Sequence, residues 1–89
     1  MEFKVIEEEK NKLIFELKGE THTFCNALKH ELQMLKGVEQ VVYRIDHPLI
    51  GVPRFSLETK GLEPKKAIKE ALANLKKKAK DFQKEISSL

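Results

Sequence analysis

Alternating apolar and polar residues predict four β-strands in this chain, because a strand with one buried face repeats every two residues. The first two strands flank a polar turn at residues 8–12 and carry the alternating apolar positions Phe3, Val5, Leu13, Phe15 and Leu17. Residues 38–45 are rich in β-branched side chains, and residues 52–59 alternate again. Pro53 is expected to place the start of that last strand at a sheet edge or a bulge, since proline cannot donate a ladder hydrogen bond.

Apolar residues at helical spacing predict two helices. The first lies between Gly19 and Gly37, and its apolar positions are Phe24, Ala27, Leu28, Leu32 and Leu35. The second opens at Pro64, where a missing N–H costs nothing. The expected order is ββαββα, an α+β fold in which two helices cover one face of a four-stranded antiparallel sheet. We expect residues 1–89 to form a single domain.

The second helix is predicted to be too long for its own sheet. Its apolar residues follow an unbroken heptad spacing at Ile68, Leu72, Leu75, Ala79, Phe82, Ile86 and Leu89. About 25 residues at ~1.5 Å each reach roughly 37 Å, whereas four strands about 4.8 Å apart span only ~20 Å. We therefore expect Phe82, Ile86 and Leu89 to extend beyond the sheet and to pack against a second chain. The alternative is a frayed, disordered tail.

The positive charge of the chain is concentrated in this same helix. Residues 64–89 hold eight lysines against three acidic residues, whereas residues 1–63 are slightly acidic and the whole chain carries +3. Such a helix could bind nucleic-acid phosphates, so the alternative function is a free-standing basic nucleic-acid-binding domain. Stacking aromatics are scarce, however, with no Trp and one Tyr. No apolar run approaches the ~20 residues of a membrane span, and a lone cysteine suits a reducing cytoplasm.

Residues 19–32, GETHTFCNALKHEL, gather polar side chains that could carry chemistry. His22 and Cys25 are neighbours on a helix, as a nucleophile and its base would be, but no glycine-rich oxyanion turn lies near them. Structural zinc needs four ligands, which one cysteine and three scattered histidines supply poorly. The favoured interpretation is a helix start capped by Thr21 or Thr23, so we expect no catalysis, cofactor or metal here.

The same stretch, together with VVYRIDHPL further on, resembles two motifs of the assembly subunits of cellular RNA polymerases. This family is related to the bacterial α N-terminal domain. The matching residues are Gly19, His22, Thr23, Asn26, Tyr43, His47 and Pro48. The separation of the motifs, the order of the elements and the absence of an inserted domain are typical of the small archaeal members, the subunit L family.

The resemblance implies a non-catalytic subunit of DNA-directed RNA polymerase. It implies a heterodimer with the larger α-like subunit, called D in archaea, on which the large catalytic subunits and the small subunits N and P assemble in the cytoplasm. It also implies that this chain has no catalytic residue or metal of its own and no direct contact with nucleic acid. The residues expected to form the partner interface, with no clean division from the core, are Phe24, Leu28, Leu32, Leu72, Leu75, Ala79, Phe82 and Ile86.

Overall fold

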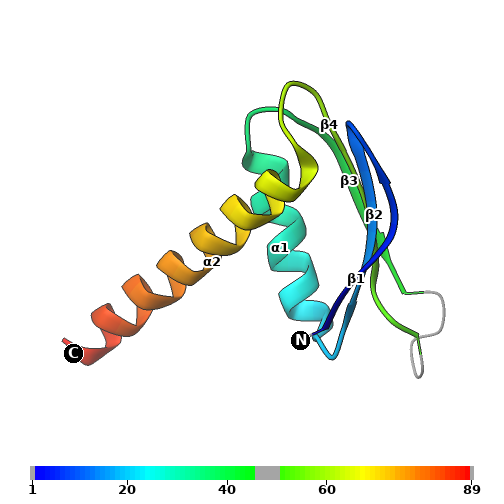
Figure 1. Ribbon diagram of the computed structural model, residues 1–89. Helices are drawn as coiled ribbons and strands as arrows, with labels where there is room; N and C mark the ends of the chain where they lie inside the picture. Colours follow the sequence, from blue (N-terminus) through cyan, green and yellow to red (C-terminus); the bar gives the residue numbers. More distant parts are fainter. Residues whose placement is uncertain (1, 46–50, 89) are drawn as a thin grey trace.

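All the predicted elements are present, in the predicted order ββαββα (Figure 1). The computed structural model describes residues 2–45 and 51–88. Its elements are β1 (Glu2–Glu9), β2 (Lys12–Lys18), α1 (His22–Met34), β3 (Val38–Arg44), β4 (Arg54–Thr59) and α2 (Pro64–Ser87). Both helices lie on one side of the sheet, so the predicted α+β fold is confirmed.

The sheet is antiparallel throughout and has the strand order β1-β2-β4-β3. β4 is therefore a central strand, between β2 and β3. Pro53 was expected at an edge or a bulge, but it lies just before β4, outside the ladder that it would interrupt. Its carbonyl accepts the N–H of Leu17 at 3.1 Å, which ties the entry of β4 to β2.

The core is built from the inward positions of β2, β3 and β4 and from one face of each helix. Its buried side chains are Leu13, Phe15, Leu17, Cys25, Leu28, Leu32, Val41, Phe55, Leu57, Ala67, Ile68 and Ala71. The strand members recur every two residues and the helix members every three or four, as burial on one face requires. α1 packs over β3, whereas the first half of α2 packs over β2, β4 and α1. β1 contributes nothing to this core.

The two helix starts follow from local chemistry. Thr21 and not Thr23 caps α1, because the Thr21 Oγ1 accepts the Phe24 N–H at 3.1 Å. α2 begins at Pro64, as predicted. After α1, Gly37 has a φ of +100°, and a Cβ on it would lie 3.0 Å from the Cβ of Leu62. Only glycine fits this turn, which leads α1 back into the sheet.

Candidate dimerisation interface

The apolar seam of α2 is buried at its start and becomes exposed along its length. Ile68 is buried against the sheet, and Leu72 and Leu75 are half-buried beside the core. In the second half of the helix, residues 76–87, every residue is exposed. We call these residues the distal half of α2. Figure 1 shows this half running away from the sheet, with its C-terminal end far from α1.

The distal half of α2 carries large apolar side chains that nothing in this chain covers. Phe82 is 64% exposed and Ile86 is 52% exposed, and Ala79 is exposed between them and Leu75. The predicted overhang is therefore present, and α2 is continuous to Ser87 instead of fraying. Leu89, the last residue of the predicted seam, lies outside the described residues.

A second group of exposed apolar side chains lies on β1, at the edge of the sheet. Phe3, Val5 and Ile6 are 42%, 39% and 41% exposed, and we call them the β1 patch. Phe3 stacks on Phe15 with ring centroids 4.9 Å apart, so Phe3 lies on the helix-bearing face of the sheet. The sequence suggested that Phe3 and Val5 would be half-buried, but all of β1 is exposed, because the two helices pack mainly on β2, β3 and β4.

The register of β1 is irregular at Ile6. The pairing between β1 and β2 shifts between Val5 and Glu7, which leaves Ile6 as the extra residue of a β-bulge. A bulge interrupts the alternation of faces, so two neighbouring residues can share one side of the sheet. Sequence reasoning missed Ile6, although an apolar residue directly after the apolar Val5 was the available signal.

The interface residues expected on α1 are divided between the core and the surface. Leu28 and Leu32 are 1% and 0% exposed, so within this chain their side chains hold α1 on the sheet. Phe24 is half-buried and packs against the core while leaving part of its ring accessible. Of the α1 residues expected at the interface, Phe24 is thus the one with accessible surface.

The polar residues of the first family motif surround the start of α1. His22, Thr23 and Asn26 are exposed there, and Gly19 turns the chain into the helix with a φ of +88°. The hydroxyl of Tyr43, on β3, lies within hydrogen-bond reach of Nδ1 of His22. Burial raises the pKa of Tyr43, so the hydroxyl keeps the proton that it can donate to the imidazole. His47 and Pro48 of the second motif lie outside the described residues.

An unbroken row of stacked rings links this motif to the β1 patch. Phe15 stacks on Phe55 at 4.9 Å and Phe55 on Tyr43 at 5.2 Å, and Tyr43 meets the His22 ring at 5.5 Å. With Phe3 at the other end, the row crosses all four strands in the order of the sheet. Aromatic pairs of this kind stabilise by ~0.5–1.5 kcal/mol beyond their buried area, so the row contributes to the stability of the sheet.

The geometry offers no catalytic dyad at Cys25. Its side chain is 0% exposed, and His22 is turned toward Tyr43 instead. Burial raises the pKa of the Cys25 thiol, and the negative charge of Glu20 raises it further, so the thiolate is disfavoured. Among residues 2–45 and 51–88, no group of three or more histidine, cysteine or acidic side chains could hold a metal ion.

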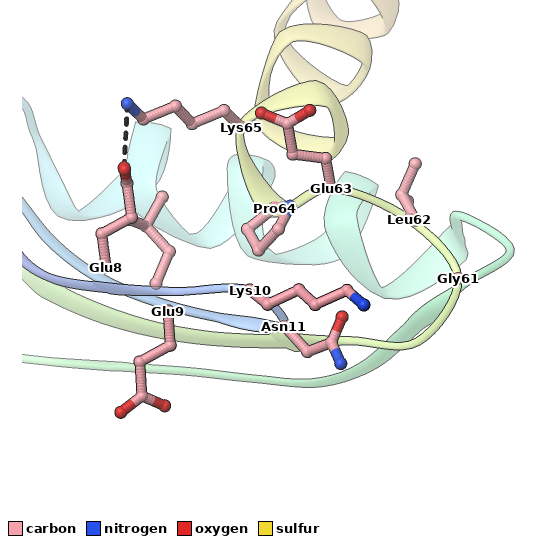
Figure 2. A pocket seen from close by; sticks show the side chains of 10 residues that line it. Glu8, Glu9, Lys10, Asn11, Gly61, Leu62, Glu63, Pro64 and Lys65 are labelled. Atoms are coloured by element: carbon pink, nitrogen blue, oxygen red, sulfur yellow. Dashed lines mark ion pairs between the residues drawn. The ribbon is translucent and has the colours of Figure 1, made fainter.

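A shallow cavity of about 760 Å³ lies between the β1–β2 turn and the start of α2 (Figure 2). Its lining residues are Glu8, Glu9, Lys10, Asn11, Leu13, Gly61, Leu62, Glu63, Pro64 and Lys65. Lys65 and Glu8 form an ion pair of 2.8 Å across it. The hydrogen bond from Lys65 to Glu8 raises the pKa of Lys65, which keeps the amine charged and unsuited to act as a base. The Lys65–Glu8 ion pair therefore links the β1–β2 hairpin to the start of α2.

The lysines of α2 are exposed, as the nucleic-acid hypothesis would need. The aromatic ring of the distal half, Phe82, lies on the apolar seam and not among the lysines. The lysine face thus has charge to hold phosphates but no stacking platform for bases. No helix in the described part of the chain is long and apolar enough to cross a membrane.

Comparison with known proteins identifies the family. Residues 12–85 match the model of the RNA polymerase Rpb3/Rpb11 dimerisation domain. The chain is 36% identical over 85 residues to the DNA-directed RNA polymerase subunit Rpo11 of Methanothermobacter thermautotrophicus, covering 96% of this chain and 98% of that protein. It is 42% identical over 84 residues to the subunit Rpo11 of Thermococcus sibiricus, covering 91% and 88% of the two chains.

The fold agrees with that of a solved relative. The crystal structure of DNA-directed RNA polymerase subunit L from Thermoplasma acidophilum superposes with a TM-score of 0.88 and 29% identity, over 98% of this chain and 86% of that one. The resemblance inferred from the two motifs is confirmed, and with it the assignment to an accessory assembly subunit instead of a catalytic one. The chain belongs to the family of the RNA polymerase Rpb3/Rpb11 dimerisation domain.

Proposed function

We propose that this chain forms a heterodimer with the larger α-like subunit of an RNA polymerase, called D in archaea, through the distal half of α2 and the β1 patch. The observation that carries the proposal is an apolar seam that continues for three turns beyond the point where its own domain can bury it. Phe82 and Ile86 are the large side chains of this extension, and full burial of such a side chain is worth ~1.5–3 kcal/mol. A partner helix supplies the cover that the sheet lacks.

The β1 patch gives the partner a second point of contact on the same side of the sheet. Phe3, Val5 and Ile6 lie on an edge strand that neither α1 nor α2 covers. A partner that packs against both the distal half of α2 and this strand would bury apolar surface from two elements. Such an interface is better defined in orientation than one between two helices alone, because contacts on two non-parallel elements fix more degrees of freedom.

The proposed heterodimer is the platform on which the large catalytic subunits and the small subunits N and P assemble in the cytoplasm. The motif residues at the start of α1, His22, Thr23 and Asn26, are exposed and form a polar surface. We assign this second surface to contacts with a large subunit, as the resemblance to the family implies. The chain contributes no catalytic residue, metal or direct nucleic-acid contact in this role.

The test is the mass of the mixture with the α-like subunit from the same source, measured by light scattering after size exclusion. We expect a stable one-to-one complex with the full chain and none with a chain truncated after Lys80, which lacks Phe82 and Ile86. A full chain that stays apart from the partner would contradict the heterodimer. A truncated chain that pairs as well as the full one would contradict only the placement of the interface.

Nucleic-acid binding by the lysines of α2 predicts a different result. Binding that neutralises phosphates weakens steeply with salt, because each contact releases counterions. The proposed heterodimer rests on apolar burial, so its affinity should change little with salt. A folded chain that ignores the α-like subunit but binds DNA with a steep salt dependence would favour the nucleic-acid function.

A further inference from the structure

A charged side chain is buried between the two helices, where α2 begins to leave the domain. Glu31, on α1, is 3% exposed and lies between the buried Leu28 and Leu32. Its carboxylate accepts a hydrogen bond from Nζ of Lys78, on α2. Glutamate is almost never buried to this extent unless it is paired. The bond to Lys78 therefore offsets the cost of burying the Glu31 carboxylate between α1 and α2.

The position of Glu31 on α1 increases its need for a cation. It lies in the last turns of the helix, where the partial negative charge of the helix dipole disfavours a carboxylate. The last turn of α1 contains no basic residue that could offset this charge. The positive charge comes instead from α2, so the two helices are joined by a directional contact as well as by apolar packing.

Lys78 lies at the boundary between the packed and the projecting parts of α2. Leu75, one turn earlier, is half-buried against the core, and the described residues of α2 after Lys78 are all exposed. The side chain of Lys78 is itself 58% exposed, so the ion pair joins a buried carboxylate to a lysine at the surface. Among the described residues, this ion pair is the last hydrogen bond or salt bridge along α2 that joins the helix to the rest of the domain.

We propose that the Glu31–Lys78 ion pair positions the distal half of α2 for the α-like partner, which makes both residues positioning residues for pairing. The inference rests on the proposed heterodimer. Apolar contacts such as those of Leu75 tolerate sliding and rotation, whereas a hydrogen bond to a buried carboxylate has one direction. A single polar residue at an otherwise apolar helix seam can fix register and partner in the same way.

The expected effect follows from the fraction of chains whose α2 points in the direction that the partner needs. The apparent dissociation constant equals the intrinsic one divided by that fraction. If loss of the ion pair lowers the fraction to about one tenth, the dissociation constant rises about tenfold. Removing only Lys78 also leaves the buried carboxylate of Glu31 unpaired, so this single variant is expected to be less stable as well.

The test compares Lys78→Met, Glu31→Met and the double substitution with the wild-type chain, by calorimetric titration of the α-like subunit. Lys78→Arg keeps the cation and should restore most of the affinity. Lys77→Met is the matched control, since it removes the same charge from an exposed lysine of the same helix. Nitroxide labels on Lys18→Cys and Lys84→Cys, in a Cys25→Ala background, report the direction of α2 by pulsed electron spin resonance.

We expect the Lys78→Met chain to bind about tenfold more weakly and to show a broader distance distribution, with Lys77→Met unchanged in both. The double methionine variant decides the outcome if the single variants do not fold, because replacing a buried ion pair by apolar residues usually preserves the fold. A double variant with wild-type affinity and a wild-type distance distribution would overturn the inference. A wild-type chain that does not pair at all would instead overturn the heterodimer.

Discussion

Truncating Phe82 and Ile86 to alanine should separate pairing from folding, because both side chains are exposed in this chain and covered in the proposed complex. An aromatic side chain can bury ~150–250 Å², and Phe82 is 64% exposed. About 130 Å² therefore remains for a partner, worth about 3 kcal/mol at ~25 cal/mol per Å². Ile86, at 52% exposed, adds a smaller contribution of about 1 kcal/mol. The sum corresponds to about a thousandfold loss of affinity.

The assay is a calorimetric titration with the α-like subunit, paired with thermal unfolding of each chain alone. The double variant should unfold within ~0.5–1 kcal/mol of the wild type, because substitutions of exposed side chains change stability little. Val42→Ala is the matched control. Val42 is 44% exposed, but it pairs with Ser56 on the face of the sheet away from the helices, so its truncation should leave the affinity unchanged.

Two results would refute this reasoning. A double variant that binds the partner as tightly as the wild type would mean that the distal half of α2 is not covered in the complex. A Val42→Ala chain that loses affinity as strongly as the double variant would mean that the partner contacts the opposite face of the sheet. A loss of affinity that merely followed a loss of folded protein would show up in the unfolding measurement.

Three further results are expected. Phe3→Ser in the β1 patch should weaken pairing about tenfold or more, with little change in the melting temperature. Strong destabilisation without loss of affinity would instead show that Phe3 acts in the core and not at the interface. Thr21→Ala should lower the free energy of unfolding by about 1 kcal/mol because it removes the cap of α1, and Thr23→Ala, its control, should not. Cys25 should react with a thiol reagent only on unfolding. Because the pKa of Cys25 is raised from 9.0 in the folded chain, the unfolded chain loses the thiol proton first, and the free energy of unfolding should fall as the pH rises above about 9. A Cys25→Ala chain should lack that pH-dependent step.

Periodicity was enough to predict the order of the elements and the overhang of α2, because each depends on local spacing and helix length. Phe82 and Ile86 lie beyond the point where a small sheet can cover a helix, and this follows from the rise per residue alone. The choice between Thr21 and Thr23 as the cap could not be made, since it depends on which hydroxyl meets the Phe24 N–H.

The exposure of β1 could not be predicted in the same way. Phe3 and Val5 alternate with charged residues as buried strand residues do, and periodicity does not tell which strand lies at the edge of the sheet. The strand order β1-β2-β4-β3 is set by long-range pairing, which places β1 at the edge of the sheet, where neither helix buries its apolar side chains. The ion pair of Glu31 and Lys78 was also hidden, because it joins residues 47 positions apart.

Amide hydrogen exchange of the chain, alone and in the one-to-one complex with the α-like subunit, tests the location of the interface most directly. We expect the amides of residues 76–87 and of β1 to gain the most protection on pairing, since the described side chains there are exposed in the isolated chain. Protection confined to other elements, such as β3, would contradict the proposed interface even if a stable complex forms.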